Sequence, residues 1–142
     1  MLKKILSIII LVTSCISHAK AAIHDVYFGT NKRNLNGIYA AKFNDANGKL
    51  TKIKQATDLM MPNFLTLHPH TPILYAISKS PNQVSSFLIE NDGSLKQQSN
   101  SKIDEGPSAH LCVHPSGNFL ITAQYGAGSV GVFSLDTQGT LI

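Results

Sequence analysis

The chain repeats itself at an interval of 46 residues, and this repeat limits the available folds more than any other feature. Residues 65–95 align with residues 111–141 without a gap. Matching positions include Leu65 with Leu111, His68 with His114, Leu74 with Leu120, Val84 with Val130 and Phe87 with Phe133. Ile38 lies one further period before Val84, so residues 26–50 belong to the same pattern. The chain therefore holds close to three copies of one structural unit.

Each copy consists of short apolar segments separated by turns. Segments rich in β-branched, aromatic and aliphatic residues predict strands, at 64–67, 73–77 and 84–89. The polar segment 96–103 suits a fourth strand at an outer edge. The His-Pro pairs and the Asn-Asp-Gly at 91–93 predict turns. Four strands in about 46 residues are typical of a β-propeller blade, so we predict an all-β chain of four-stranded antiparallel blades.

The number of blades is too small for a closed ring. Propellers close with about four to eight blades, because each blade needs neighbours on both faces. Residues 22–142 make about 2.6 blades, so we expect an incomplete propeller. Two explanations remain open. The chain is a truncated product or fragment, or its copies self-associate through unpaired blade faces.

Residues 1–21 have the pattern of an export signal. Lys3 and Lys4 precede an apolar run that is too short to span a bilayer, and small residues flank Lys20 near a cleavage site. This predicts export, with the periplasm as destination. The segment 12–15 also resembles a bacterial lipoprotein box. In that alternative, the chain contacts the membrane through a lipid anchor at Cys15 on the bacterial envelope.

Charge and cysteine content exclude other classes. The formal charge of +4 includes three lysines of the leader, and the remaining Lys and Arg nearly balance the acidic residues. No basic stripe is left to bind phosphates, so we expect no nucleic-acid partner. Removal of the leader leaves Cys112 without a cysteine partner, and its apolar surroundings predict a small buried side chain.

Four short motifs in order resemble one known family. They are Val-Tyr-Phe-Gly-Thr at 26–30 followed by Gly-Ile-Tyr at 37–39, Asn-Phe-Leu-Thr-Leu-His-Pro at 63–69, Gly-Pro-Ser-Ala-His at 106–110, and Ala-Gln-Tyr-Gly-Ala-Gly-Ser-Val at 123–130. The sequence resembles the N-terminal third of the seven-bladed β-propeller lactonases, the family of the propeller-type 6-phosphogluconolactonases and the fungal carboxymuconate cyclases. It departs from the family at Gln124, where Asn is usual, and at 31–33.

Blade topology selects the candidate site residues. In an up-and-down blade, the start of the first strand and the end of the second lie at the same end of the propeller. His110 holds the first position, while Gln124 and Tyr125 hold the second. Asn63 and Arg33 occupy comparable places in the earlier copies. The resemblance implies that His110 belongs to the central pocket, where it would polarise a lactone carbonyl or move a proton.

We therefore predict His110 as catalytic, and Tyr125, Gln124, Asn63 and Arg33 as substrate-binding. Packing for Tyr125 and a solvated loop for Arg33 remain alternatives. His68 and His70 belong to turns at the opposite end and lack the neighbouring ligands of a metal site, so we expect no metal and no cofactor.

Two functions remain open. The resemblance implies a lactonase that hydrolyses a sugar lactone, truncated and inactive as a chain of this length. Export favours an unphosphorylated lactone over a phosphorylated cytoplasmic metabolite. The alternative is a non-enzymatic exported propeller that binds a sugar-derived ligand or a protein.

Overall fold

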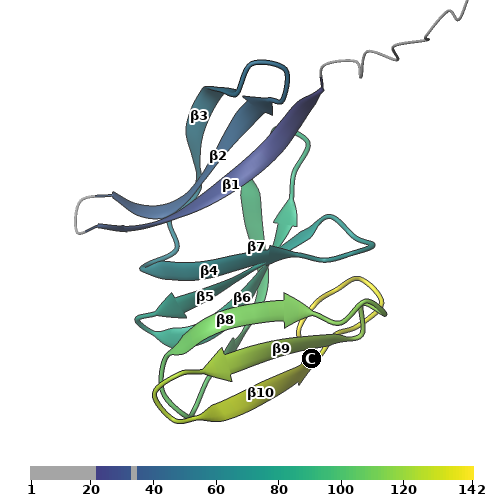
Figure 1. The fold of residues 1–142 in the computed structure, drawn as a ribbon. Helices are drawn as coiled ribbons and strands as arrows, with labels where there is room; N and C mark the ends of the chain where they lie inside the picture. The colour runs from purple at the N-terminus through teal and green to yellow at the C-terminus, as the bar shows by residue number, and fades with distance from the viewer. Residues whose placement is uncertain (1–21, 33–34) are drawn as a thin grey trace, which may run out of the picture.

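A computed structural model describes residues 22–32 and 35–142. The described chain is all-β, as predicted, and forms three antiparallel sheets (Figure 1). The first sheet has the order β1-β2-β3, with β1 (Ile23–Lys32), β2 (Leu35–Asn44) and β3 (Lys49–Thr57). The second is β4-β5-β6-β7, with β4 (Pro62–Leu67), β5 (Ile73–Lys79), β6 (Asn82–Ile89) and β7 (Leu95–Lys102). The third is β8-β9-β10, with β8 (Ser108–Val113), β9 (Phe119–Gln124) and β10 (Ser129–Ser134).

The second sheet is a complete four-stranded blade, and its strands agree with the predicted segments. In β5, six successive residues from Ile73 to Ser78 are buried, because sheets pack against both faces of this strand. The predicted outer strand is β7, whose side chains are mostly exposed. The polar sequence of this segment therefore matches its place at the edge of the blade.

The repeat of 46 residues is also a repeat of geometry. Cross-strand pairing of Ile89 with Leu95 in the second sheet recurs as an isolated bridge between Leu135 and Leu141 beside the third. Turn glycines Gly93 and Gly139 both have positive φ, at 83° and 84°. Glycine is favoured in this conformation because it has no Cβ to clash with the backbone.

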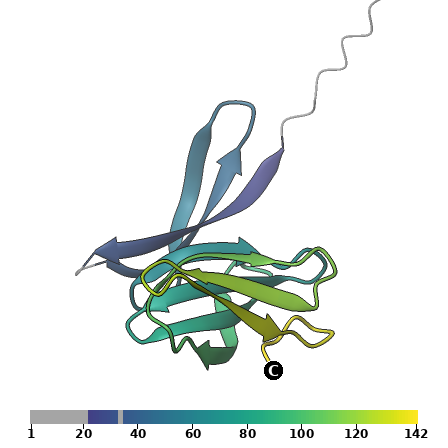
Figure 2. The same ribbon diagram turned by 60° about the horizontal axis from the view of Figure 1, so that its bottom comes forward.

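The same repeat shows which strands the first sheet contains. Ile38, Val84 and Val130 lie one period apart and fall in β2, β6 and β10. Strand β1 therefore corresponds to β5 and β9, and β3 corresponds to β7. No described residues form a first-sheet counterpart of β4 and β8. Strand β1 lies beside β4 (Figures 1 and 2). Segments 25–28 and 65–67 of these two strands line an apolar groove of about 580 Å³.

Two hydrophobic clusters fill the spaces between the sheets. The cluster between the second and third sheets includes Tyr75, Ile77, Leu111 and Leu120. The cluster between the first and second sheets includes Ile38, Leu74, Ala76, Phe87 and Leu95. These clusters alternate along β5, because successive side chains of a strand point to opposite faces. Each sheet is thus stabilised by its neighbour, as expected for blades.

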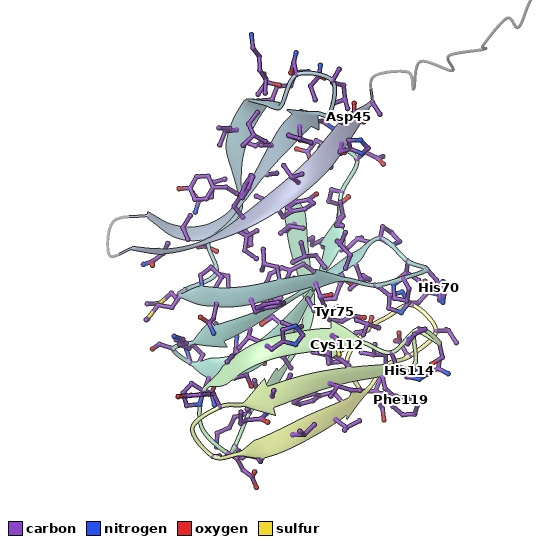
Figure 3. All side chains as sticks on the ribbon, viewed as in Figure 1. Asp45, His70, Tyr75, Cys112, His114 and Phe119 are labelled. Atoms are coloured by element: carbon purple, nitrogen blue, oxygen red, sulfur yellow. The ribbon has the colours of Figure 1, made fainter. Side chains whose placement is uncertain are left out.

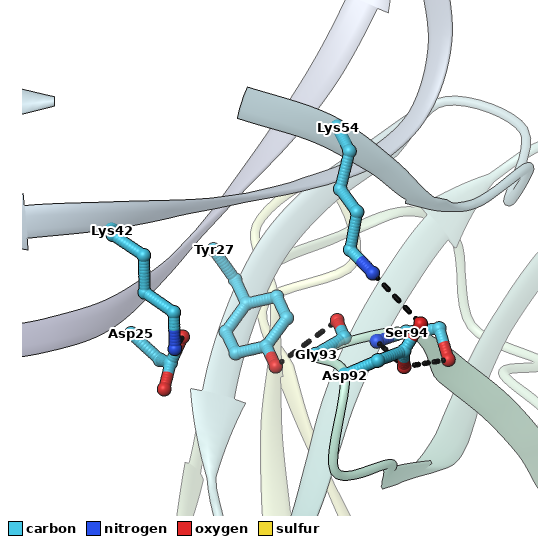
Figure 4. Close-up of polar contacts among 7 residues, drawn as sticks. All are labelled: Asp25, Tyr27, Lys42, Lys54, Asp92, Gly93 and Ser94. Atoms are coloured by element: carbon cyan, nitrogen blue, oxygen red, sulfur yellow. Dashed lines mark hydrogen bonds and ion pairs between the residues drawn. The ribbon is translucent and has the colours of Figure 1, made fainter. Parts of the chain in front are cut away.

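A tyrosine-to-glycine hydrogen bond recurs at both sheet junctions. Tyr75 donates its hydroxyl to the carbonyl of Gly139 at 2.5 Å, and Tyr27 donates to the carbonyl of Gly93 at 3.3 Å (Figure 4). Burial, with a smaller contribution from the Asp136 charge, raises the pKa of Tyr75 well above its ordinary value. Burial also raises the pKa of Tyr27. In both pairs, the tyrosine of one blade holds a turn of the next.

Charged groups reinforce the junction of the first two sheets. Lys54 of β3 pairs with Asp92 at 2.9 Å in the turn that contains Gly93 (Figure 4). Asp92 also accepts hydrogen bonds from the backbone and hydroxyl of Ser94. These bonds, led by the Ser94 hydroxyl, hold the pKa of Asp92 well below its usual range. The carboxylate therefore stays charged near neutral pH and fixes the turn against β3.

The His-Pro turns lie at a sheet junction and have a packing role. His68 is only 9% exposed, and its Nδ1 accepts hydrogen bonds from the backbone N–H groups of His70 and Thr71. Since Nδ1 is an acceptor, Nε2 carries the proton and donates to the carbonyl of Gly117 at 3.0 Å. His70 Nε2 lies 2.9 Å from the carbonyl of Pro115. The first turn of the second blade thus binds a turn of the third blade.

Cys112 lies within the described part of the chain (Figure 3), whereas the predicted leader does not. Cys112 is exposed, so the prediction of a buried thiol was wrong. The side chain of Leu111 faces the neighbouring sheet, and Cys112, one residue later, lies on the face that no described sheet covers. The predicted export signal, the lipoprotein segment and Cys15 lie outside the described residues. No helix in the described part of the chain is long and apolar enough to cross a membrane.

Candidate functional site

The candidate site lies where β8 begins and β9 ends. Antiparallel pairing puts Ser108 opposite Gln124 and His110 opposite Ala123. The start of the first strand and the end of the second therefore lie at the same end of the blade, as the topology predicts. Strands β4 and β8 are neighbours across the junction of the second and third sheets (Figure 1). This places the beginning of β8 next to the beginning of β4.

His110 is exposed and packs against one aromatic ring. The centroids of the His110 and Phe64 rings are 4.4 Å apart, with an angle of 54° between the planes. Neither nitrogen of His110 has a hydrogen-bond partner among the described residues, whereas the other four described histidines each use a ring nitrogen in a hydrogen bond. His110 is thus free to bind water or a ligand through its nitrogens.

Asn63 lies beside His110 but already has a partner. Its Nδ2 donates to the carbonyl of Ser108 at 2.9 Å, across the junction between β4 and β8. The side chain is half-buried. The structure therefore brings Asn63 and His110 together at one junction, and the Asn63 amide nitrogen is bound to the backbone of the strand that carries His110.

Gln124 faces a different space from His110. Its side chain is 3% exposed, and its Nε2 donates to the hydroxyl of Thr122 at 2.8 Å. Its Oε1 is buried and has no hydrogen-bond partner among the described groups. Gln124 lines a groove of about 280 Å³ between β10 and segment 102–105, and neither His110 nor Asn63 lines that groove. Because side chains alternate along β9, Gln124 and Ala123, the partner of His110, point to opposite faces.

Of the remaining predicted residues, one is highly exposed and the other lies outside the described residues. Tyr125 is in the turn after β9 and is 88% exposed, so the alternative of a packed ring does not describe it. Arg33 lies outside the described residues. Within the described segments, no group of three His, Cys, Asp or Glu side chains gathers as a metal ion would require.

Sequence reasoning missed two contacts at and near the candidate histidine. Phe64 contacts the His110 ring, and the Ser108 carbonyl receives the Asn63 amide. The repeat contains a signal for the first, because Phe64 lies one period before His110 and thus holds the same place in the preceding blade. No local pattern points to the Ser108 carbonyl, since a backbone acceptor has no sequence signature.

Antiparallel meanders that pack face to face, with their inner strands side by side, define part of a β-propeller. Comparison with known proteins gives the family. The sequence profile of the family described as "Lactonase, 7-bladed beta-propeller" matches residues 25–142, and the chain belongs to that family. The resemblance drawn from the four motifs is confirmed.

Individual relatives agree with this assignment. The chain is 30% identical over 119 residues to a Bacillus subtilis 6-phosphogluconolactonase, covering 81% of this chain and 34% of the relative. A Bacteroides uniformis structure is similar with a TM-score of 0.77 at 24% identity, covering 84% of this chain and 36% of that one. A Pseudomonas aeruginosa structure named periplasmic gluconolactonase has a TM-score of 0.61 at 19% identity, covering 83% and 37%. The chain thus spans about a third of the length of the relatives it matches.

Proposed function

We propose that this chain contributes to a lactone hydrolase that opens a sugar lactone by adding water. The observation that carries the proposal is His110, an exposed histidine at the start of β8 in a lactonase-family propeller, whose two ring nitrogens bind no other described residue. Packing on one face and free nitrogens suit an imidazole that works on a bound molecule. Such a group typically contributes about 10²–10⁴-fold in rate as a general acid or base.

The proposed reaction uses His110 to move a proton. Water attacks the lactone carbonyl carbon and transfers a proton to an imidazole nitrogen, and a tetrahedral oxyanion forms. Collapse of this intermediate breaks the ring C–O bond, and the leaving alkoxide takes the proton back from the imidazolium. The product is the open-chain hydroxy acid, and His110 returns to its neutral form.

Substrate contacts come from the other predicted residues. Tyr125 is fully accessible for a hydrogen bond to a substrate hydroxyl. Gln124 offers a buried carbonyl oxygen that has no hydrogen-bond partner within residues 22–32 and 35–142, which suits a hydroxyl donor that enters its groove. Asn63 retains its side-chain oxygen as an acceptor, because only its nitrogen is bound to Ser108. Arg33 completes the proposed set through its positive charge.

An unphosphorylated sugar lactone is the proposed substrate, because the leader predicts export from the cytoplasm. We propose a periplasmic protein, with anchoring at Cys15 as the alternative. Fractionation of the native cells tests this, together with a Cys15→Ser variant. Loss of membrane association in the variant supports the lipid anchor, whereas cytoplasmic protein of full length contradicts export.

The test of the activity begins with the native product. Because the chain spans a third of its relatives, we expect no turnover by the 142-residue chain alone, and activity in a longer product. The mass of the protein in its own cells is measured first. Hydrolysis of gluconolactone and of its 6-phosphate is then measured for that product, for His110→Ala and for His114→Ala.

The two histidines form a matched pair, because both are exposed and belong to the third blade. We expect His110→Ala to lower kcat at least about 10²-fold and His114→Ala to leave it unchanged. Equal rates for both variants would contradict the role of His110. Tight ligand binding without any turnover would instead favour the non-enzymatic propeller.

A further inference from the structure

The junction between β4 and β8 contains two β-bulges at the same place in the repeat. The pairing of β4 with β5 shifts between Pro62 and Phe64, and the pairing of β8 with β9 shifts between Ser108 and His110. These positions are one period apart. A bulge inserts an extra residue and changes the direction of the side chains beside it. The direction of the His110 side chain therefore depends on the exact shape of the second bulge.

Asn63 ties this bulge to the neighbouring blade. The carbonyl that receives its Nδ2 belongs to the peptide between Ser108 and Ala109, inside the bulge of β8. Ser108 is 1% exposed, so water has little access to replace the donor. A carbonyl fixed at 2.9 Å limits rotation of the peptide that leads to His110. The amide of Asn63 thus holds the backbone at Ser108, two residues before His110.

Phe64 holds the ring itself. Its side chain is partly buried and packs against the hydrophobic cluster between the second and third sheets. The cluster therefore supports the Phe64 ring, which also contacts the imidazole of His110. No hydrogen bond among the described residues orients His110, so aromatic packing is the contact that limits its rotation. This arrangement fixes the ring without using either nitrogen.

We infer that Asn63 and Phe64 of the second blade are positioning residues for His110 of the third. Asn63 fixes the bulge that aims the side chain, and Phe64 fixes the ring. The inference rests on the proposed function of His110 for its catalytic consequence, but the positioning is a property of the folded chain. It assigns Asn63 a role in orientation in addition to the substrate contact that the sequence predicts.

The direct test is nuclear magnetic resonance of the chain with isotope-labelled histidine. We expect cross-relaxation between the His110 and Phe64 ring protons, and a ring-current shift of the His110 signals. Phe64→Leu removes the ring and should remove that shift, whereas Phe64→Tyr keeps the ring and should retain it. Phe119→Leu is the matched control, because Phe119 lies beside the ring of another histidine, His114. It should leave the His110 signals unchanged.

A substitution of Asn63 tests the bulge. Asn63→Asp keeps the shape of the side chain and removes the Nδ2 donor, so the cross-relaxation between His110 and Phe64 should weaken. This variant and Phe64→Tyr leave the apolar cluster in place, so they decide the question if Phe64→Leu does not fold. Unchanged His110 signals in Asn63→Asp, or equal shifts in Phe64→Leu and Phe119→Leu, would overturn the inference.

Kinetics of the native lactonase product separate positioning from general stability. A misplaced catalytic group costs up to about 10²-fold in rate, so kcat should fall on that scale in Phe64→Leu and Asn63→Asp with KM nearly constant. Phe64→Tyr should restore kcat. If the product hydrolyses no lactone but the resonance shifts occur, the proposed function fails and the positioning stands. If lactone is hydrolysed and kcat is unchanged in both variants, positioning for catalysis is refuted.

Discussion

Gly117 lies against the ring of His68, and replacing this glycine with alanine tests how the blades are held together. Gly117 has φ = 77°, and a Cβ at this position would lie 2.8 Å from both Cε1 and Nε2 of His68. Its carbonyl also accepts the His68 hydrogen bond. The substitution therefore strains the backbone and displaces a buried ring from the neighbouring blade.

The expected cost has two parts. Left-handed backbone costs an L-residue about 1–2 kcal/mol, of which the lower entropy of the unfolded alanine chain returns about 0.4–1 kcal/mol. The clash with His68 adds about 1–3 kcal/mol, as overpacking of a core does. We expect Gly117→Ala to lower the free energy of unfolding by about 1–5 kcal/mol in total.

Gly106→Ala isolates the backbone part. Gly106 has φ = 80°, and no atom lies within 4 Å of its Cβ position. Urea unfolding at one protein concentration measures both variants, because association would otherwise change the apparent stability. We expect Gly106→Ala to cost about 1 kcal/mol or less.

A double substitution tests whether the ring of His68 causes the extra cost of Gly117→Ala. In a His68→Ala background, the remaining close contact of the Cβ at 117 is Cδ2 of the exposed His70 side chain, at 3.2 Å, so the costs of the two glycine substitutions should come close together. If Gly117→Ala costs no more than Gly106→Ala in the parent chain, the ring of His68 does not pack against this turn. The junction would then rest on the hydrophobic cluster alone.

Two further predictions concern the tyrosine hydrogen bonds and the uncovered face of the third sheet. Tyr75→Phe leaves the Gly139 carbonyl without its donor, so it should cost about 1–3 kcal/mol, more than Tyr27→Phe, whose bond is longer and half-buried. The pKa of Tyr75 is raised in the folded chain, so its contribution to stability is complete below the unfolded pKa near 10 and falls as pH rises above that value. Urea titrations at several pH values should show that Tyr75→Phe removes this alkaline decrease. An unchanged slope of unfolding free energy against pH would contradict the prediction. Val130 and Val132 are 66% and 63% exposed on β10, so we expect the purified chain to self-associate. Light scattering should give a lower apparent mass for Val132→Lys than for the parent chain. A monomeric parent chain would contradict this prediction.

The repeat made the blade architecture predictable. Segments 73–77 and 84–89 alternate or run apolar between turn residues, and they form β5 and β6 close to the predicted bounds. These signals are local, because strand preference and turn chemistry act over a few residues. Family membership followed from the order and spacing of the motifs, and the family profile confirms it.

The surroundings of the candidate site residues were harder to predict, because neighbouring sheets decide whether a strand face is covered. The sequence around Cys112 is apolar, yet its side chain is exposed, since the third sheet has a described neighbour on one face only. Gln124 and His110 share one end of the blade, but strand alternation turns them to different spaces. The sequence alone could place Gln124 and His110 at one end of the blade, but it could not show which face of the sheet each side chain occupies.

The positions of the strands, their antiparallel order and the repeated turns could all be predicted from the sequence, because they depend on contacts within about one repeat. The surroundings of each candidate residue could not, because they depend on how the sheets pack together. His68 is buried and hydrogen-bonded through both ring nitrogens, whereas His110 is exposed and bonds through neither nitrogen to any residue that the structure describes. His68 directly follows β4, and His110 lies within β8, the strand at the corresponding place in the next blade. The difference arises from the packing of one blade on the next and from a bulge, which act between residues far apart in the chain.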